Sequence, residues 1–108
     1  SQNGRLVYPV ARERRGVVVE QILFMFYVYI LKSKKDNKLY IGSTNDLRKR
    51  ILEHSKGRVL STSNRRPLEL VYYEAYKVEH DARLREQSFK KSGSVYNGLM
   101  KRIKESLK

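Results

Sequence analysis

The chain has 108 residues and a formal net charge of +13, with 24 Lys and Arg against 11 Asp and Glu. This length suits one modest hydrophobic core, and the charge excess favours a polyanionic partner, either nucleic acid or an anionic membrane surface. The apolar stretch from Leu23 to Leu31, which Ile22 precedes, is far shorter than the roughly 20 residues of a membrane-spanning helix. The absence of cysteine excludes disulfides and thiolate metal sites and fits a cytoplasmic location. We therefore expect nucleic acid as the partner.

Residues 1–24 differ in character from the rest of the chain. They begin without Met and show no clean period before the valines at positions 17–19. We expect residues 1–24 to be a tag remnant or an upstream extension, with disorder as one outcome. A real extra strand or helical turn at 17–23 is the alternative. Residues 25–108 are expected to form the single domain, for which a monomer is the favoured state.

The clear organisation of the chain begins at residue 26. Residues 26–32 form a nearly continuous apolar and aromatic run, which is typical of a strand covered on both faces. Turn residues at 34–37 lead into a second short strand at 38–42. The pattern therefore predicts a hairpin.

A helix and a third strand follow the hairpin. The spacing of apolar residues predicts a helix over 45–56, which Gly57 ends. Residues 58–67 read as a polar, basic loop. Residues 68–76 read as a strand whose apolar run is broken by glutamates.

Two helices complete the chain. The first is predicted over 79–92 and is stopped by Gly93, and the second follows from apolar residues spaced four apart between 95 and 107. The order strand-strand-helix-strand-helix-helix predicts an α+β fold. In that fold a small three-stranded, mostly antiparallel sheet is flanked by helices.

Three tyrosines of the predicted hairpin fall on one face of the sheet. Tyr29 and Tyr40 share a face if the hairpin loop has an even number of residues, because directly opposite side chains point the same way. Tyr27 precedes Tyr29 by two residues and joins that face. The alternative is that these rings only pack, since tyrosine is a good strand residue. Their position just before a cationic helix favours a functional site.

The helix after the hairpin brings cations close to those tyrosines. Arg50 and His54 are four residues apart and stack on one helix face, at the border of the surface that must face the core. Arg48 and Lys49 point elsewhere and suit phosphate contacts or a solvated face. For His54 alone, a surface histidine that complements the helix dipole is the alternative.

Glu86 is the most informative single residue of the sequence. Ala82, Glu86 and Phe89 lie on one stripe of the second helix, so a carboxylate falls among apolar positions. A carboxylate there is costly unless it is paired or bound to a metal. An ion pair with Lys90 at i+4, or with an arginine, is the alternative to a metal site.

From about Met25 to Leu107 the chain resembles the GIY-YIG endonucleases. The resemblance is greatest to their small single-domain bacterial members, which are related to the nuclease domain of the excision-repair incision subunit. The second half of the signature is intact as Tyr40-Ile41-Gly42. In the first half, Tyr27-Val28-Tyr29 stands where Gly-Ile-Tyr is expected, a change that small members tolerate. Residues 65–72 also resemble the stretch that small members carry before the following helix.

The resemblance assigns roles to individual residues. Arg50, ten residues past Tyr40, matches the family's helix arginine, and His54 matches the histidine or tyrosine one turn later. Glu86 matches the metal-binding glutamate in the helix after the third strand. Asn97 is a candidate for an asparagine that larger relatives carry near the C-terminus.

The implied reaction is hydrolysis of phosphodiester bonds in duplex or branched DNA, in a repair-related or structure-specific role. A divalent metal, Mg²⁺ or Mn²⁺, would act as the Lewis acid on Glu86. Arg50 would bind the phosphate oxygens through its planar guanidinium. Tyr29 or Tyr40 would orient or deprotonate the nucleophile, and a base role requires a phenol pKa below its usual value of about 10. His54 would assist proton transfer or hold a tyrosine.

Five further cations are expected to contact DNA phosphates: Arg48, Lys49, Arg58, Arg65 and Arg66. The alternative function is a non-catalytic module that stacks bases on tyrosines and binds phosphates with cations. Glu86 distinguishes the two, because a module that only binds gains nothing from a carboxylate aimed at a polyanion.

Overall fold

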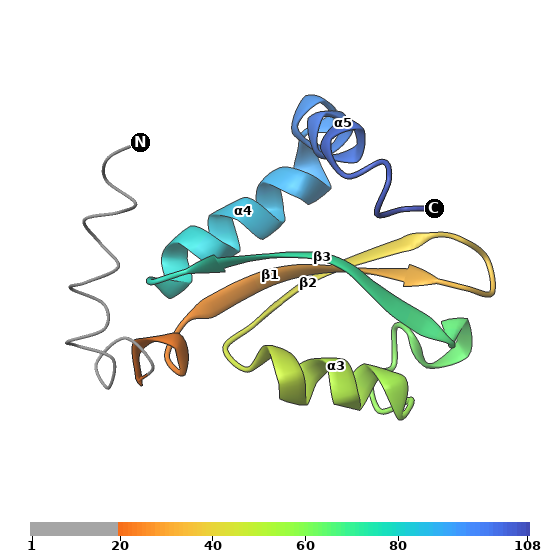
Figure 1. The fold of residues 1–108 in the computed structure, drawn as a ribbon, viewed down its shortest axis with the longest axis horizontal. Coiled ribbons are helices and arrows are strands. Elements are labelled where there is room, and N and C mark those ends of the chain that lie inside the picture. The colour runs from red at the N-terminus through yellow and green to blue at the C-terminus, as the bar shows by residue number, and fades with distance from the viewer. Residues whose placement is uncertain (1–19) are drawn as a thin grey trace.

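The computed structural model describes residues 20–108, so the expectations for residues 1–19 lie outside the described part of the chain. Seven elements follow one another along the chain (Figure 1): β1 (Phe26–Ser33), β2 (Leu39–Thr44), α3 (Leu47–Ser55), the 3₁₀ helix η1 (Ser63–Arg65), β3 (Leu68–Tyr76), α4 (Glu79–Lys91) and α5 (Gly93–Arg102). Before β1, residues 20–22 are helical. No helix among residues 20–108 has the length and apolar character to cross a membrane.

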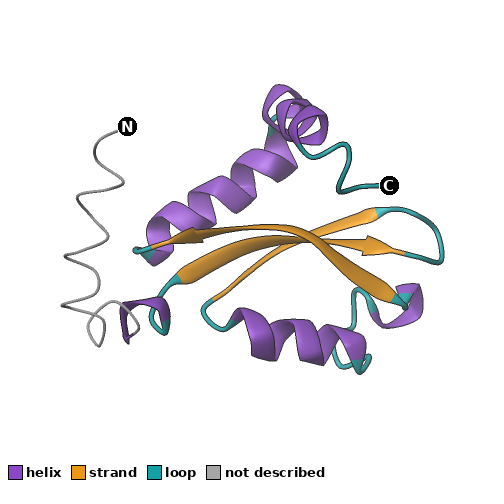
Figure 2. Ribbon diagram, viewed as in Figure 1, coloured by secondary structure: helices purple, strands orange, loops and turns teal. Residues whose placement is uncertain are grey.

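The three strands form one antiparallel sheet in the order β2-β1-β3 (Figure 2). β1 is the central strand, and its residues 28–31 are at most 1% exposed. This confirms the prediction of a strand covered on both faces. The α+β class and the predicted order of the elements are also confirmed.

Helices cover both faces of the sheet (Figure 1). On one face, Val28 and Ile30 pack with buried residues of α4 and α5, among them Ala82, Phe89 and Leu99. Burial of each large aliphatic or aromatic side chain there contributes about 1.5–3 kcal/mol relative to exposure. The helix α3 lies against the opposite face. β2, at the edge of the sheet, therefore runs between α3 on one side and α4 on the other.

The observed helix ends differ from the predicted ones by a few residues, for local reasons. Asp46 caps α3, because its side chain accepts a hydrogen bond from the Lys49 backbone N–H at 3.1 Å. Ser92 does the same for α5, so that helix begins at Gly93, earlier than predicted. It also ends earlier, at Arg102, although Ile103 still packs in the core. Gly57 ends the first helix as predicted, in a left-handed conformation with φ of 76°.

Glu74 fixes α4 against β3. The sequence showed this glutamate only as a break in an apolar strand, whereas its side chain is 14% exposed and accepts hydrogen bonds from Arg85 and from two tyrosine hydroxyls. Burial raises the pKa of Glu74, but these hydrogen bonds outweigh burial and hold the pKa below its ordinary value. Because Arg85 precedes Glu86, the Arg85–Glu74 ion pair at 2.9 Å helps to set the rotation of α4 about its axis.

Gly42 is required by the close approach of an aromatic ring. It lies directly opposite Tyr29 in the sheet, and a Cβ atom at position 42 would stand 2.5 Å from the Tyr29 hydroxyl and 2.6 Å from its Cζ atom. The Tyr29 ring is buried and cannot swing away. Glycine therefore leaves the space that the tyrosine occupies.

We predict that Gly42→Ala destabilises the protein by about 1–3 kcal/mol, the usual cost of overpacking a filled core. Thermal melts measure the change. Gly98→Ala is the matched control: nothing lies within 4 Å of a Cβ atom there, and alanine favours a helix over glycine by roughly 0.5–1 kcal/mol. Equal melting temperatures for Gly42→Ala and the wild type would contradict the account of this contact.

Candidate functional site

Tyr29 and Tyr40 lie on the same face of the sheet, as predicted. Tyr40 pairs with Leu31, two residues beyond Tyr29, and both tyrosines face α3. Their ring centroids are 6.3 Å apart. Tyr29 is 1% exposed, whereas Tyr40, nearer the edge of the sheet, is only partly buried. The two signature tyrosines thus have different access to solvent.

His54 joins α3 to these tyrosines. Its Nε2 atom lies 2.8 Å from the Tyr29 hydroxyl, and its Nδ1 atom lies 2.8 Å from the hydroxyl of Thr62. Its ring also meets the ring of Tyr40 edge to face, with centroids 5.1 Å apart. The expectation of a border position, and the alternative of a surface histidine, are wrong: His54 is 1% exposed. Burial is tolerated because both ring nitrogens have partners.

Tyr29 and His54 are both neutral at physiological pH. Burial raises the pKa of Tyr29 to about 12, although the nearby Arg50 guanidinium acts in the opposite direction. Burial lowers the pKa of His54, and the nearby positive charge of Arg50 lowers it further. The lowered phenol pKa that a direct base role requires is therefore not a property of Tyr29 in the free protein. The Tyr29 hydroxyl keeps its proton beside a neutral imidazole.

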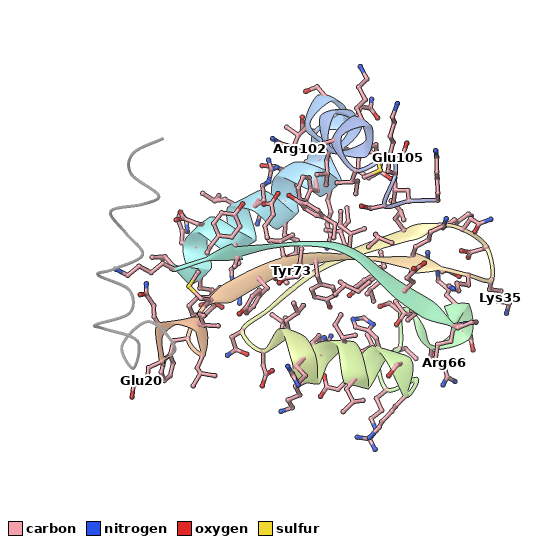
Figure 3. All side chains as sticks on the ribbon, in the orientation of Figure 1. Glu20, Lys35, Arg66, Tyr73, Arg102 and Glu105 are labelled. Atoms are coloured by element: carbon pink, nitrogen blue, oxygen red, sulfur yellow. The ribbon has the colours of Figure 1, made fainter. Side chains whose placement is uncertain are left out.

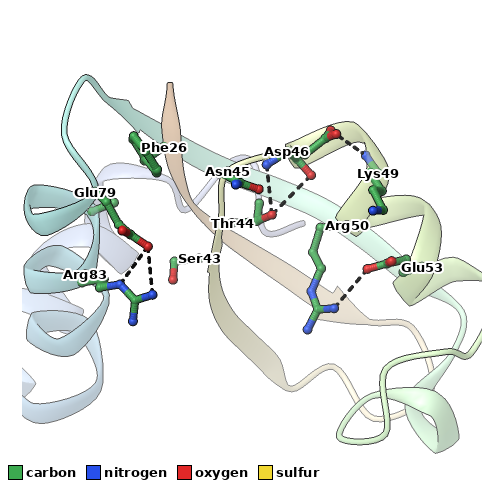
Figure 4. A pocket seen from close by; sticks show the side chains of 11 residues that line it. Phe26, Ser43, Thr44, Asn45, Asp46, Lys49, Arg50, Glu53, Glu79 and Arg83 are labelled. Atoms are coloured by element: carbon green, nitrogen blue, oxygen red, sulfur yellow. Dashed lines mark hydrogen bonds and ion pairs between the residues drawn. The ribbon is translucent and has the colours of Figure 1, made fainter. Parts of the chain in front are cut away.

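Arg50 lies at the border of the buried surface, as predicted. Its side chain is 37% exposed, and its Nη1 atom is 3.0 Å from a carboxylate oxygen of Glu53. It lines a cleft of about 440 Å³ between α3 and α4 (Figure 4). The guanidinium can therefore reach a ligand in the cleft while it remains close to Tyr29.

Glu86 lies on the other side of β2. Its carboxylate accepts a hydrogen bond from the Ser43 hydroxyl at 2.7 Å and pairs with the Lys90 ammonium at 2.8 Å, so the ion pair expected at i+4 is present. The side chain is 20% exposed. Burial raises the pKa of Glu86, but the hydrogen bonds from Lys90 and Ser43 outweigh it and lower the pKa, so the carboxylate is charged.

The edge strand β2 brings the two sides together. Gly42 faces Tyr29 and α3, whereas Ser43 is the next residue and points to α4 and Glu86. Only the thickness of the strand β2 separates the Tyr29 side from the Glu86 side. The negative charge of Glu86 contributes to the raised pKa of Tyr29. The cleft passes over this edge, with Ser43 on its floor, Arg50 on the α3 side and Arg83 on the α4 side (Figure 4).

The donor set at Glu86 suits one kind of metal. Among residues 20–108, no group of three or more His, Cys, Asp or Glu side chains is placed to hold a metal ion. A closed zinc-type site is therefore absent from the described residues. Glu86, with the Ser43 hydroxyl beside it, fits a cation such as Mg²⁺, which commonly takes one or two carboxylates and completes its shell with water and substrate phosphates.

The five cations predicted to contact phosphates do not cluster in space. Lys49 lines the cleft, Arg48 is exposed on α3, and Arg58 is exposed just after that helix. Arg65 and Arg66 lie beside the β1–β2 turn, at the opposite end of the sheet (Figure 3).

Part of the side chains of Arg65 and Arg66 is committed within the protein. Arg65 Nε lies 3.5 Å from a carboxylate oxygen of Asp36, close enough for an ion pair but without hydrogen-bond geometry. Arg66 donates a hydrogen bond to the Ser63 carbonyl at 3.0 Å, and its guanidinium packs over Gly57.

Tyr27 and Asn97 lie apart from the cluster. Tyr27 shares the face of Tyr29, but its ring packs against Tyr73 with centroids 5.9 Å apart, and its hydroxyl contacts the Ile22 carbonyl. Asn97 is exposed on α5, and within residues 20–108 no hydrogen bond joins it to the site residues. Ser43 and Thr62 are the two contacts that sequence reasoning missed. Ser43 adjoins the signature glycine, which is the one signal that could have drawn attention to it.

Comparison with known proteins agrees with this geometry. Residues 25–98 match the model of the GIY-YIG catalytic domain. The chain belongs to the GIY-YIG family. Tyr40-Ile41-Gly42 therefore takes its place as the second half of the family signature, and the approach of Tyr29 explains the glycine in it.

Small bacterial proteins are among the relatives of this GIY-YIG chain. It is 43% identical over 65 residues to a UPF0213 protein of Bacillus pumilus, a match that covers 59% of this chain and 65% of the relative, just under two thirds. It is 47% identical over 68 residues to a UPF0213 protein of Clostridium perfringens, covering 62% and 72% of the two chains. No solved structure is detectably similar.

The raised pKa of Tyr29 predicts a measurable titration. Of the eight tyrosines, those at 29, 72 and 76 have pKa values of about 12. Tyr29→Phe should remove one late-titrating phenol, as read by ultraviolet absorbance in a stopped-flow pH jump that precedes unfolding. The wild type should lose stability between pH 10 and 12, because the unfolded chain then releases protons that the folded protein retains. The Tyr29→Phe variant should lose less stability than the wild type over the same pH range.

Tyr76→Phe is the reference for this titration. Tyr76 lies on the other face of the sheet, and its pKa is also raised, so this variant should likewise remove one phenol that titrates late. Loss of a phenol that titrates near pH 10 in Tyr29→Phe would contradict the burial account.

Proposed function

We propose that this GIY-YIG protein is a metal-dependent endonuclease that hydrolyses DNA phosphodiester bonds, in a repair-related or structure-specific role. The observation that carries the proposal is the convergence at one sheet edge of the Tyr29–His54 hydrogen bond, Arg50 and a charged Glu86. These groups come from β1, α3 and α4. Arg50 and Ser43, the hydrogen-bond partner of Glu86, both line one cleft at this edge. The family and the net charge of +13 support DNA as the substrate.

Each side chain has a role that fits its surroundings. A divalent cation, Mg²⁺ or Mn²⁺, would bind at Glu86 and supply Lewis-acid stabilisation of the phosphate. The partly exposed guanidinium of Arg50 binds the non-bridging oxygens, where its planar fork suits two acceptors. Tyr29 accepts a proton from the nucleophilic water while its own hydroxyl proton passes to His54 Nε2. The water oxygen then bonds to phosphorus as the P–O bond to the leaving oxygen breaks, and the leaving oxygen takes a proton from solvent. Tyr40, the more exposed phenol, is the other candidate to contact the water.

Phosphates outside the reacting centre would be bound by the surrounding cations. Lys49 lines the cleft and Arg48 is its exposed neighbour on α3, so these two lie nearest the proposed site, whereas Arg58 follows the far end of that helix. Arg65 and Arg66 would contact DNA only if it extends along the sheet, because the eight-residue strand β1 from Phe26 to Ser33 is roughly 23 Å long.

A non-catalytic DNA-binding module is the second candidate. The ion pair of Glu86 with Lys90 favours it, since this pair already neutralises the carboxylate. In that case the tyrosines would serve packing or base stacking, and the cations would bind phosphates.

Nicking by the wild type distinguishes the two functions, and Glu86→Gln tests the metal role of Glu86. The amide keeps the size of the side chain but removes the charge that attracts a cation, so Mg²⁺- or Mn²⁺-dependent nicking of supercoiled plasmid should fall at least about a hundredfold. DNA affinity should hold or increase, because a negative charge facing phosphate is gone. A time course of nicking and a binding titration on one preparation measure both.

Two control variants complete this experiment. Glu105→Gln removes an exposed carboxylate that pairs with Lys108, and it should nick at the wild-type rate. If Glu86 serves only its ion pair, Lys90→Met and Glu86→Gln should lose similar stability and leave nicking unchanged. That result would refute the metal site at Glu86. A wild type that cuts no plasmid, flap, fork or single-stranded DNA with either metal would refute the endonuclease function.

A further inference from the structure

Thr62 has no role in the reaction proposed above, yet it is buried in contact with His54, the histidine of the proposed site. It lies in the loop between α3 and η1 and is 0% exposed. Its hydroxyl is 2.8 Å from His54 Nδ1 and 3.4 Å from the Val59 carbonyl oxygen. A buried hydroxyl between a ring nitrogen and a carbonyl constrains where protons can sit, because a carbonyl can only accept.

The other ring nitrogen faces a similar constraint. His54 Nε2 contacts the Tyr29 hydroxyl at 2.8 Å. The guanidinium of Arg50, whose positive charge acts on this hydroxyl, has only N–H donors and cannot accept its proton. Among the described neighbours of the Tyr29 oxygen, His54 Nε2 is therefore the group able to accept its proton.

One arrangement of protons satisfies every group. Tyr29 donates to His54 Nε2, and the proton on His54 Nδ1 is donated to Thr62. The Thr62 hydroxyl then donates to the Val59 carbonyl. In the reverse tautomer, with the proton on Nε2, the buried Tyr29 hydroxyl proton has no acceptor, which costs free energy.

We infer that Thr62 is a positioning residue that fixes the neutral His54 ring with its proton on Nδ1, so that Nε2 accepts the hydrogen bond of the Tyr29 hydroxyl. The tautomer follows from the hydrogen bonds alone. Its use in catalysis rests on the proposed endonuclease function, in which the Tyr29 proton passes to His54. Thr62 itself touches neither the phosphate nor the water.

The tautomer can be read without any activity. Long-range ¹H–¹⁵N correlation spectra of the full-length protein near neutral pH distinguish a protonated from a bare ring nitrogen. The spectrum of His54 should show protonated Nδ1 and bare Nε2, with His80, the other histidine of the chain, as the internal comparison. A wild-type spectrum with the proton on Nε2 would overturn the inference.

Two substitutions at position 62 test the cause. Thr62→Val removes the hydroxyl at nearly constant volume, so the Nε2-protonated form of His54 should become populated. Thr62→Ser keeps the hydroxyl and should restore the wild-type spectrum. The rate of plasmid nicking should fall about tenfold in Thr62→Val and recover in Thr62→Ser. A tenfold loss is smaller than the hundredfold or more that removal of a proton-transfer group costs. Ser63→Ala, which removes a neighbouring hydroxyl bonded to the Leu60 carbonyl, should change neither readout.

The outcomes separate the two claims. An unchanged tautomer in Thr62→Val overturns the role of Thr62, and a changed tautomer with unchanged nicking overturns its part in catalysis. If Thr62→Val unfolds, the wild-type and Thr62→Ser spectra still decide the tautomer. A wild type that cuts no DNA refutes the endonuclease function, while the spectra decide the tautomer independently.

Discussion

The arrangement of the site depends on one buried side chain, Tyr29. It sits in the central strand with its ring across Gly42, and its hydroxyl reaches His54 on α3. A hydrogen bond between two groups that are each 1% exposed is worth more than its surface equivalent, because neither partner can turn to water. The Tyr29–His54 hydrogen bond therefore fixes the position of α3 over the sheet. It also fixes the backbone position from which the Arg50 side chain extends.

On the other face, two polar contacts hold α4 in a matching position. Glu74 of β3 binds Arg85, and Ser43 of β2 binds Glu86, so successive residues of one helix are tied to the two outer strands. The family sequence pattern thus has a physical reading. Its second glycine admits a tyrosine on one face of the edge strand, and the next residue meets the glutamate on the other.

Much of the fold could be predicted from the sequence, because hydrophobic period and turn residues report local structure directly. The strand at 26–32, the helix stop at Gly57 and the placement of Glu86 beside apolar residues all follow from such patterns. The burial of His54 could not be predicted, because its partner Thr62 lies in an irregular loop without a period. Arg65 and Arg66 show the converse limit: they flank the site in the sequence, but the chain returns along the sheet and places them at its far end.

The central claim is that Tyr29 and His54 act as one unit, and a double-mutant cycle on plasmid nicking tests it most directly. Tyr29→Phe, His54→Gln and the double variant are compared under single-turnover conditions, with thermal melts to confirm folding. If the two side chains share one proton path, the double variant should nick no more slowly than the slower single variant. Losses that multiply in the double variant would show independent roles and contradict the account.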